Sequence, residues 1–447
     1  MGAAEYNDPG LKLLSARTAA RVLAVALAVP LVALGIGSLP WSPERAATAP
    51  RVTSTARGAG SLRAGAAEVR FALPANTPIG GFARLTYESE GNHGPVGARA
   101  LVLEEPGCRV ALVSAEILLV PETLQAEIAS RVADLGLSGL VFAATHTHAG
   151  PGGYVDGLFF ERLATGAYDP RMRGVIVEAA VAAIREAAGA LEPARLATIR
   201  SAADDLARSR SGGLEDAPLT VLRLVHPDGA PLAELTVFAA HATILGKRNR
   251  VISGDWPGRF LQGGTHGPRV FFQGAIGDQS TEGPSSGSPR GFANVLSSRV
   301  DALPFGTPDP APALAFAAAE LGLPRNEIGG APALLRPAAR NLAARTFPAS
   351  ARVEAIRLGP VLLAAVPGEP TSAVGAAWRA TLPSGAVVVS LANGYVGYVE
   401  EPARMAEREG ETHLTYYGPA LAQTLGTALG AAADAADRAE LGAAQAR

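Results

Sequence analysis

The chain has 447 residues, of which 48% are hydrophobic and 18% are charged, and its formal net charge at pH 7 is -2. This composition is that of a globular protein with a large core, which excludes a disordered chain and gives no sign of a nucleic-acid-binding surface. The single cysteine, Cys108, excludes an internal disulfide and a cysteine-rich zinc site.

The first segment of the chain has the pattern of a targeting sequence. Residues 1–21 carry three basic side chains, and an apolar run follows over residues 22–41. A basic segment before an apolar one is typical of a secretory signal or an N-terminal membrane anchor, with the basic side left in the cytoplasm. We therefore expect an exported protein.

Whether the apolar run is cleaved decides between a secreted and a membrane-anchored protein. The small residues at 47–49 resemble a cleavage site, but they lie well beyond residues 22–41. This position favours a retained anchor. The Ala-, Gly-, Arg- and Thr-rich residues 42–68 are expected to form a flexible linker, so that residues 69–447 form the folded domain.

The folded domain begins with a strand–helix–strand pattern. Apolar runs at 98–104 and 109–118 predict two strands, and residues 121–136 predict an amphipathic helix that starts at a proline and ends at a glycine. The run 140–144 has the length and the β-branched and aromatic content of a buried strand. Together these elements predict a βαβ unit and a locally parallel sheet.

Further along, residues 174–191 predict an alanine-rich helix, and 219–225 with 235–240 predict a hairpin. Residues 304–352 are expected to be connecting loops with a short helix, and residues 418–447 to be mostly helix. The predicted fold class is α/β, with mixed β-sheets and flanking helices in one large domain.

Polar side chains follow the apolar strands at several places in this domain. The run 235–240 leads into His241, 269–276 into Asp278 and Ser280, 361–366 into Glu369, and 386–391 into Tyr395 and Tyr398. Buried strands with functional loops at their ends are the way in which α/β folds assemble sites from distant parts of the sequence.

The motif Thr145-His146-Thr147-His148 follows the predicted strand 140–144. Residues two apart on an extended segment point the same way, so both imidazoles would face one side if the strand continued to Thr147. There they could meet a metal ion, a substrate, or one of each. With only 7 histidines in the chain, this spacing is suggestive, although a pair of surface loop histidines would have the same pattern.

A mononuclear zinc hydrolase needs three or four nitrogen or oxygen ligands and a position open to water. His146, His148, His241 and Glu369 are suitable residue types. Taken singly, His241 fits a core histidine better than a metal ligand, and Glu369 fits a solvated loop carboxylate better. No HExxH motif occurs, which excludes the common helical zinc site.

Serine chemistry is the competing enzymatic interpretation. Residues 283–287 formally match GxSxG, but no strand immediately precedes them, so the context of a nucleophile elbow is missing. Ser280 follows a strand end and lies near Asp278 in the sequence, which also suits a turn or a helix cap.

Taken in order, five segments of the chain resemble the neutral/alkaline (non-lysosomal) ceramidase family. They are the HTHAGPGG string that begins at His146, the strand that leads to His241 with the Ser253-Gly254-Asp255 motif after it, and the segments at 277–280, 366–369 and 393–399. The resemblance covers roughly residues 69–419.

The resemblance implies a Zn²⁺-dependent amidase that cleaves the N-acyl bond of ceramide into a fatty acid and sphingosine. It implies four metal ligands, which are His146, His241, Glu369 and Tyr398, with Tyr395 as the alternative to Tyr398. It also implies that His148 contacts the reacting group and that a serine and an arginine complete the catalytic site. Ser280 matches the serine, and Arg208 is the better match for the arginine, with Arg210 as the alternative.

Three departures from the family pattern concern the substrate more than the zinc chemistry. The C-terminal immunoglobulin-like domain usual in the family is not expected here. A family tyrosine that helps to bind substrate aligns with Gly410, and Thr281 follows Ser280 where the family has a proline. We therefore predict a zinc amidase that acts on ceramide or another lipid N-acyl amide at a membrane surface, with no nucleic acid and no obligate protein partner. The alternatives are a serine hydrolase built on Ser280 and a non-catalytic lipid-binding protein.

Overall fold

The computed structural model describes residues 46–84, 86–92, 94–214 and 216–444. The predicted cytoplasmic segment 1–21 and the predicted anchor 22–41 lie outside these residues. Among the helices of the described part, none has the length and apolar character needed to cross a bilayer.

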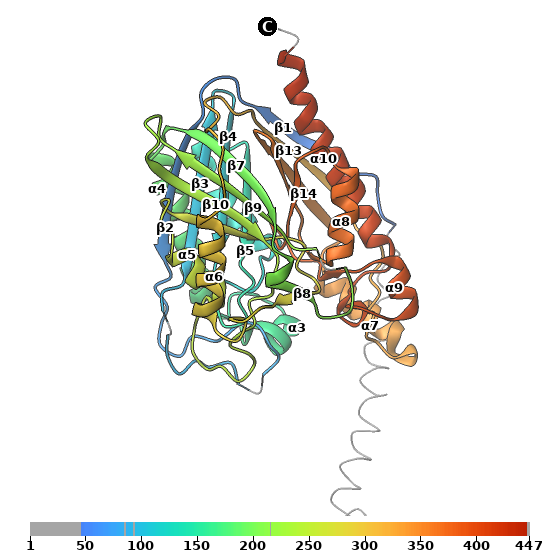
Figure 1. Ribbon diagram of the computed structural model, residues 1–447. Helices are drawn as coiled ribbons and strands as arrows, with labels where there is room; N and C mark the ends of the chain where they lie inside the picture. Colours follow the sequence, from blue (N-terminus) through green and yellow to red (C-terminus); the bar gives the residue numbers. More distant parts are fainter. Residues whose placement is uncertain (1–45, 85, 93, 215, 445–447) are drawn as a thin grey trace, which may run out of the picture.

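Three β-sheets form the body of the molecule (Figure 1). In spatial order, the first comprises β5 (Gly139–Ala144), β4 (Cys108–Ala115), β3 (Gly97–Glu105), β2 (Arg63–Arg70) and β6 (Glu192–Pro193). The second comprises β11 (Arg269–Gln273), β10 (Pro231–Phe238), β9 (Pro218–Val225) and β7 (Arg195–Ala202). The third comprises β1 (Arg51–Arg57), β13 (Leu314–Gly322), β14 (Ser350–Leu358), β15 (Val361–Ala365) and β17 (Ala386–Val389). Two short pairs join β8 (Ala207–Ser209) to β12 (Gln279–Thr281) and β16 (Glu369–Pro370) to β18 (Tyr398–Val399).

Helices cover the outer faces of these sheets. The α-helices are α2 (Glu122–Arg131), α3 (Leu158–Phe160), α4 (Pro170–Gly189), α5 (Asp255–Gln262), α6 (Pro289–Asp301), α7 (Arg336–Thr346), α8 (Ser372–Thr381), α9 (Pro402–Glu407) and α10 (Ala420–Ala444). The single turns of 3₁₀-helix are η1 (Ala133–Leu135), η3 (Asp204–Leu206), η4 (Ala333–Leu335) and η5 (Thr412–Leu414), and η2 (Glu161–Thr165) is a π-helical turn. Helix α4 packs on β2 and β3, α10 packs on β1, β13 and β14, and α5 packs beside α6 and β11.

Strands that are buried on both faces explain the continuous apolar runs of the sequence. In β3, Ala98, Ala100 and Val102 face the helix side of the sheet, whereas Leu101 and Leu103 face the interior. That interior cluster also takes leucines and valines from the second and third sheets, so the three sheets share one core. The mixed α/β class predicted from the sequence is confirmed.

The predicted βαβ unit and hairpin are both present. Strand β4 pairs with β5 in parallel, and α2 connects them. Strands β9 and β10 pair in antiparallel register, with Leu235 opposite Leu222. Helix α4 begins at Pro170, after Asp169 caps its first turn by accepting a hydrogen bond from the Arg171 amide.

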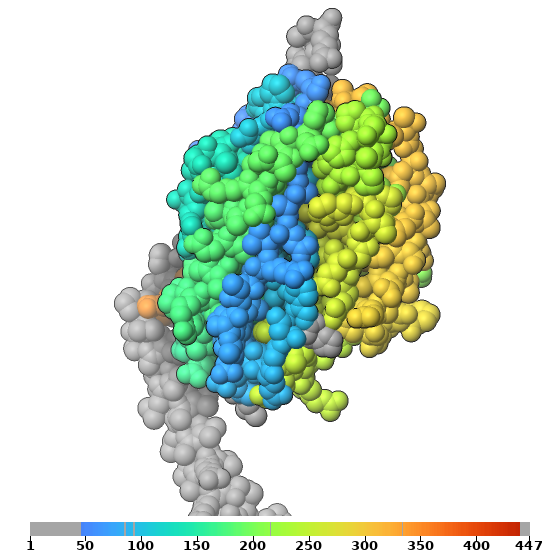
Figure 2. All heavy atoms as spheres, turned by 90° about the vertical axis from the view of Figure 1, so that its left-hand side faces the viewer, coloured from blue at the N-terminus to red at the C-terminus, as the bar shows by residue number. Residues whose placement is uncertain are grey.

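The expectation of a flexible linker over residues 42–68 is wrong for most of that segment. Strand β1 pairs with β13, and β2 pairs with β3 along its whole length. In Figure 2 the blue residues run down the body between the green and the yellow segments and are part of it. Composition misled because the small side chains pack between neighbours: a Cβ on Gly65 would lie 2.2 Å from the Ala187 carbonyl oxygen of α4.

The expectation for residues 304–352 also needs correction. This segment contains the nine-residue strand β13, which lies between β1 and β14, as well as α7 and the start of β14. Its alanine-rich sequence has little of the β-branched and aromatic content that marks a strand, yet β13 is almost fully buried. Tertiary packing, rather than local propensity, makes it a strand.

The polar strand ends predicted from the sequence come together at one edge. Three strand pairs, β4–β5, β10–β11 and β15–β17, are parallel, so the two carboxyl ends of each pair lie side by side. Single backbone bridges join these ends across sheets, between Ala143 and Ala392 and between Thr147 and Ala242. The buried Gln273 amide donates to the carbonyls of Thr145 and Ala240, which ties β5 to β10.

Candidate metal centre

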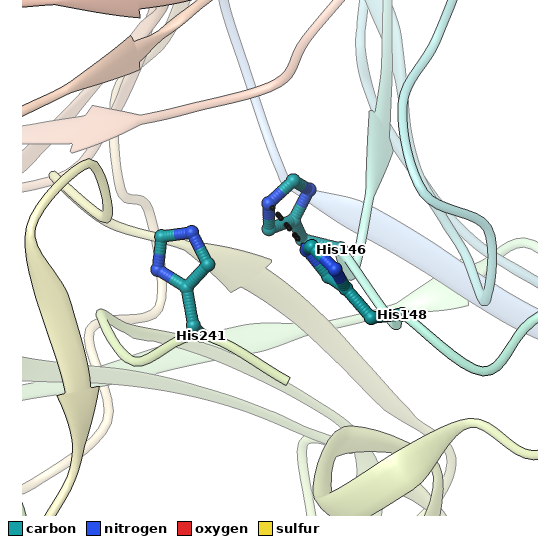
Figure 3. A group of neighbouring side chains, drawn as sticks. All are labelled: His146, His148 and His241. Carbon is teal, nitrogen blue, oxygen red and sulfur yellow. Dashed lines mark hydrogen bonds between the residues drawn. The ribbon is translucent and has the colours of Figure 1, made fainter. Parts of the chain in front are cut away.

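A left-handed turn, and not a continued strand, aims the two histidines of the HxH motif. Strand β5 ends at Ala144, and His146 has a φ of 63°. Its imidazole nevertheless lies against that of His148, with 3.2 Å between the two Nε2 atoms (Figure 3). The two imidazoles therefore come together as the sequence predicts, but the backbone that brings them together is a turn and not an extended strand. Left-handed non-glycine residues cost free energy and concentrate at functional sites.

Backbone carbonyls fix the orientation of His146 and His241. The Nδ1 atom of His146 lies 2.7 Å from the Leu118 carbonyl oxygen, and that of His241 lies 2.9 Å from the Gln279 carbonyl oxygen. Since a carbonyl only accepts, both Nδ1 atoms carry a proton, and in the neutral ring Nε2 then presents its lone pair to the centre. Burial, followed by the charge of Arg210, lowers the pKa of His241 to about 4, so His241 is neutral at pH 7.

The carboxylate of Glu369 faces both of these Nε2 atoms. Its Oε2 atom lies 3.1 Å from that of His146 and 3.4 Å from that of His241. The side chain is fully buried, and Oε2 has no hydrogen-bond donor. The other oxygen, Oε1, accepts a hydrogen bond of 2.7 Å from the Tyr395 hydroxyl.

Tyr398 completes this arrangement from β18. Its hydroxyl oxygen lies 3.0 Å from the Nε2 atom of His241 and accepts a hydrogen bond from Arg210. Burial and then the Glu369 charge raise the pKa of Tyr398 well above its usual value, so the protonated phenol donates to His241. Tyr395 binds Glu369, whereas Tyr398 meets a histidine, which fits the choice of Tyr398 over Tyr395.

This donor set fits a metal ion. The Oε2 atom of Glu369 is buried without a hydrogen-bond partner among the described residues and faces the Nε2 atoms of His146 and His241, and a cation bound between these atoms would compensate the buried carboxylate charge. Ligands that bind zinc at about 2.0–2.1 Å with tetrahedral angles are roughly 3.3 Å apart. The separations of 3.0 to 3.4 Å found here match that spacing.

His148 belongs to the same cluster, and Phe82 and Arg84 support it. The possible ligand atoms of His146, His148 and His241 all lie within 4.8 Å of one another. The ring of His148 packs 4.7 Å from that of Phe82, and Arg84 donates a 3.1 Å hydrogen bond to its carbonyl oxygen. Burial, and then the neighbouring histidines, lower the pKa of His148 well below its usual value. The division of the two motif histidines between metal and substrate stays a prediction.

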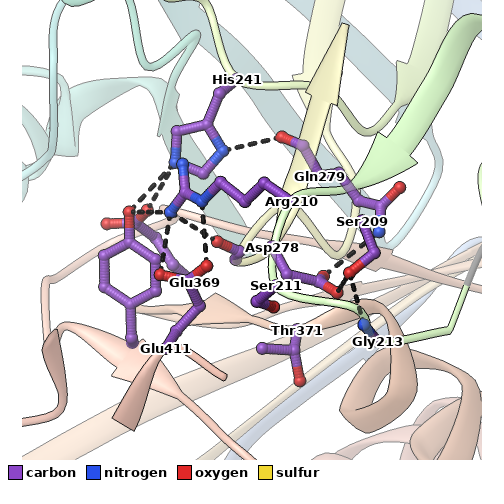
Figure 4. Close-up of polar contacts among 12 residues, drawn as sticks. Ser209, Arg210, Ser211, Gly213, His241, Asp278, Gln279, Glu369, Thr371 and Glu411 are labelled. Atoms are coloured by element: carbon purple, nitrogen blue, oxygen red, sulfur yellow. Dashed lines mark hydrogen bonds and ion pairs between the residues drawn. The ribbon is translucent and has the colours of Figure 1, made fainter. Parts of the chain in front are cut away.

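The structure favours Arg210, the alternative, over Arg208. Arg208 has a 60% exposed side chain and pairs with Glu282 at 2.6 Å. Arg210 donates to the Tyr398 hydroxyl at 3.1 Å and to the Gly277 carbonyl at 3.0 Å (Figure 4). The reason is local: β8 ends at Ser209, and the turn that follows directs Arg210 inward. Arg210 therefore contacts a residue of the candidate site, and its catalytic role stays a prediction.

Ser280 lies beside the centre on β12, where it forms a backbone bridge with His241. The nearby Asp278 is not a partner for a nucleophile, because its carboxylate accepts hydrogen bonds from Ser209 and Ser372. His241 gives its Nδ1 proton to a backbone carbonyl. These contacts favour the metal interpretation over a serine hydrolase.

Several residues of the site had no assigned role in the sequence. Glu411 holds Arg210 through two hydrogen bonds of 2.9 and 3.2 Å, and Arg84 and Phe82 support His148. The two glycines before Phe82 were a usable signal: Gly81 has a φ of 124°, and a Cβ there would lie 2.6 Å from the His148 backbone. Only glycine allows this close approach.

Gly410, which aligns with a family tyrosine, occupies a position that excludes a side chain. Its φ is 59°, and a Cβ would lie 2.1 Å from a carboxylate oxygen of Glu400. Another tyrosine, Tyr416, is close enough to interact with the Glu369 charge: burial and then that charge raise its pKa, and its ring stacks on Phe347 with 4.1 Å between ring centroids.

Comparison with known proteins agrees with the resemblance found in the sequence. Residues 72–260 match the family model for neutral/alkaline non-lysosomal ceramidase, N-terminal. A neutral ceramidase from Mycobacterium tuberculosis (strain ATCC 25618 / H37Rv) is 30% identical over 116 residues, which make up 24% of this chain and 18% of that protein. Residues 72–260 are thus similar to the neutral ceramidases. The matched family region contains His146, His148 and His241, whereas Glu369 and Tyr398 lie beyond it.

Solved ceramidase structures share the fold over most of the chain. The crystal structure of neutral ceramidase from Pseudomonas aeruginosa superposes with a TM-score of 0.70 at 20% identity, covering 85% of this chain and 75% of that one. A ceramidase complexed with C2 gives a TM-score of 0.71 at 19% identity with the same coverage. The roles of Glu369 and Tyr398 thus rest on the geometry of this chain.

Proposed function

We propose that the protein is a zinc-dependent amidase that hydrolyses the N-acyl bond of a lipid amide, with ceramide as the first candidate substrate. The observation that carries the proposal is the convergence of His146 and His241 on Glu369, whose buried Oε2 atom lies 3.1 and 3.4 Å from their Nε2 atoms. The relatives named as ceramidases support the choice of an N-acyl lipid.

Four side chains would hold the zinc ion: His146, His241, Glu369 and Tyr398. Bound zinc would supply Lewis-acid polarisation of the amide carbonyl and would lower the pKa of a water molecule to about 7. The backbone carbonyls behind His146 and His241 keep their Nε2 atoms directed at this position. Arg210 would stabilise the phenolate form of Tyr398, because it already donates to that oxygen.

His148 and Arg210 are the groups placed to act on the substrate. The Nε2 atom of His148 lies 3.2 Å from that of His146, so a proton taken up by His148 stays next to the reacting carbonyl and can pass to the leaving amine. The guanidinium of Arg210, held by Glu411, supplies fixed positive charge for the developing oxyanion. Ser280, on the strand bridged to His241, is a second hydroxyl donor for the same purpose.

A panel of ceramides and other N-acyl lipids, assayed with added zinc, tests this function. Wild-type protein should release fatty acid, a chelator should abolish the release, and His146→Ala should be inactive. His226→Ala is the matched control, because His226 is a partly exposed histidine that pairs with Glu192 outside the cluster. Release that survives chelation, or that persists in His146→Ala, would exclude a metal mechanism.

We also propose that the protein is exported and that residues 22–41 anchor it in the membrane. The support is the basic segment before the apolar run. Protease added to intact cells should digest the folded domain, whereas complete protection would contradict export.

A further inference from the structure

Exposed leucines gather on two short helical segments of the described structure. Leu158 and Leu163 lie on α3 and η2 with exposed fractions of 71% and 49%, and Leu334 and Leu342 lie on η4 and α7 with 90% and 46%. Exposed apolar side chains that gather in one region mark an interaction site. We name these four leucines, together with the arginines of α7, the docking face.

The two segments are neighbours and lie at the same end of the molecule (Figure 1). The rings of Phe159 and Phe160 approach that of Phe347, which directly follows α7, at 5.4 and 5.8 Å between centroids. Phe160 also contacts Tyr395 at 6.2 Å, and the Tyr395 hydroxyl binds Glu369 of the candidate metal centre. A series of neighbouring aromatic rings therefore connects the docking face to the candidate site.

All charged side chains of α7 are basic. The helix carries Arg336, Arg340 and Arg345 and no acidic residue. A pocket of about 330 Å³ beside it is lined by Arg336, Arg340 and Arg408 against one carboxylate, Glu327, which pairs with Arg340 at 3.3 Å. A basic helix with exposed apolar side chains is typical of a segment that lies in the interface of a bilayer.

We propose that the docking face binds the surface of an anionic lipid bilayer, with the four leucines inserted at the headgroup boundary and the α7 arginines on the phosphates. A second copy of the chain is the less suitable occupant. A twofold-symmetric contact through α7 would place its three arginines against the same three arginines, which repel. The proposal goes beyond the proposed function, because binding here does not require an active metal centre.

A fluorescent probe at Leu334 tests the proposal in the full chain. The probe, which is sensitive to solvent polarity, is attached to Leu334→Cys and, as the matched control, to Asp228→Cys in the exposed turn between β9 and β10, at the end of β10 away from His241. The native Cys108 does not compete for the label, since it is buried and burial raises the pKa of its thiol to about 12. Vesicles of phosphatidylcholine, with or without phosphatidylglycerol, are then added.

Vesicles that contain phosphatidylglycerol should shift the Leu334 probe towards an apolar environment and leave the Asp228 probe unchanged. Adding Arg336→Gln and Arg340→Gln, which removes two arginines of the docking face, should raise the vesicle concentration needed for half the shift by about 25-fold, at about fivefold for each arginine. Equal shifts at both positions, equal response to neutral vesicles, or a shift without vesicles that grows with protein concentration would overturn the proposal. The last result would identify a second copy as the occupant. None of these readings depends on amidase activity.

Discussion

At the metal centre, each imidazole is oriented by the atom that faces away from the site. The carbonyls of Leu118 and Gln279 accept the Nδ1 protons of His146 and His241, so both rings present Nε2 to Glu369. Outer partners of this kind fix the tautomer and the ring orientation of metal-binding histidines. Such backbone partners cannot be deduced from the sequence, because Leu118 and Gln279 contribute only their main chain.

Arg210 and Arg208 give the sharpest test at the level of single residues. We expect Arg210→Gln to lower kcat/KM by about 10²–10³, because it removes the donor to Tyr398 and leaves Glu411 without its partner. Arg208→Gln should keep a value close to wild type, since Arg208 pairs with Glu282 in solvent. Steady-state kinetics on a soluble short-chain N-acyl amide measure both, and a larger loss for Arg208→Gln would contradict the assignment.

The pH dependence of stability has a source far from the centre, at Glu105. Its side chain is 3% exposed, and burial raises its pKa to about 7, although Arg57 opposes the shift. The folded state thus holds a proton that the unfolded chain releases near the usual value of 4.5, so this residue costs stability as pH rises from 4.5 to 7.

Replacing Glu105 with glutamine removes this ionisation. Urea unfolding should show Glu105→Gln to be more stable than wild type at pH 8, with the difference shrinking towards pH 4.5. A difference that stays constant over this range would show that Glu105 does not ionise as its environment implies.

The four candidate metal ligands could be predicted from the sequence, whereas the residues that orient the side chains around them could not. His146, His241, Glu369 and Tyr398 each follow an apolar strand, and parallel pairing brings such ends together. Arg208 and Arg210 lie two residues apart, Arg208 in β8 and Arg210 at the start of the turn after it, and that turn has no distinctive sequence. Glu411 follows the left-handed Gly410 and reaches Arg210 over about 200 positions of sequence, so no local pattern reveals it.

Among the elements, β1 shows how far composition can mislead. Its sequence RVTSTAR was expected in a linker, yet its residues pair with β13 from Arg51 to Arg57. It forms one edge of the third sheet, on which α10 packs. Its residues do not alternate between buried and exposed, so only the pairing with β13 identifies it as a strand.

Removing β1 should therefore destabilise the folded domain. A chain that begins at residue 46 should keep the melting temperature of the full chain, whereas one that begins at residue 59 should melt roughly 5 °C or more lower. Several backbone hydrogen bonds of about 1 kcal/mol each are lost, and β13 becomes an unpaired edge. Equal melting temperatures for the two shortened chains would restore the linker interpretation.

At the scale of the whole molecule, three sheets share one core and direct their strand ends to one place. The centre draws His146 from the first sheet, His241 from the second, and Glu369 and Tyr398 from segments that follow the third. The helices α3 and α7, with their exposed leucines, lie at the same end of the molecule (Figure 1). The fold thus places the candidate site and the docking face next to each other.

The zinc content of purified protein tests the central claim most directly. Wild-type chain, and the control Glu282→Gln at an exposed loop carboxylate, should each bind one equivalent of zinc. Glu369→Gln, which keeps the shape of the side chain and removes its charge, should bind at least about 100-fold more weakly. A wild-type protein that binds no zinc, or a Glu369→Gln variant that binds it equally well, would contradict the metal centre described here.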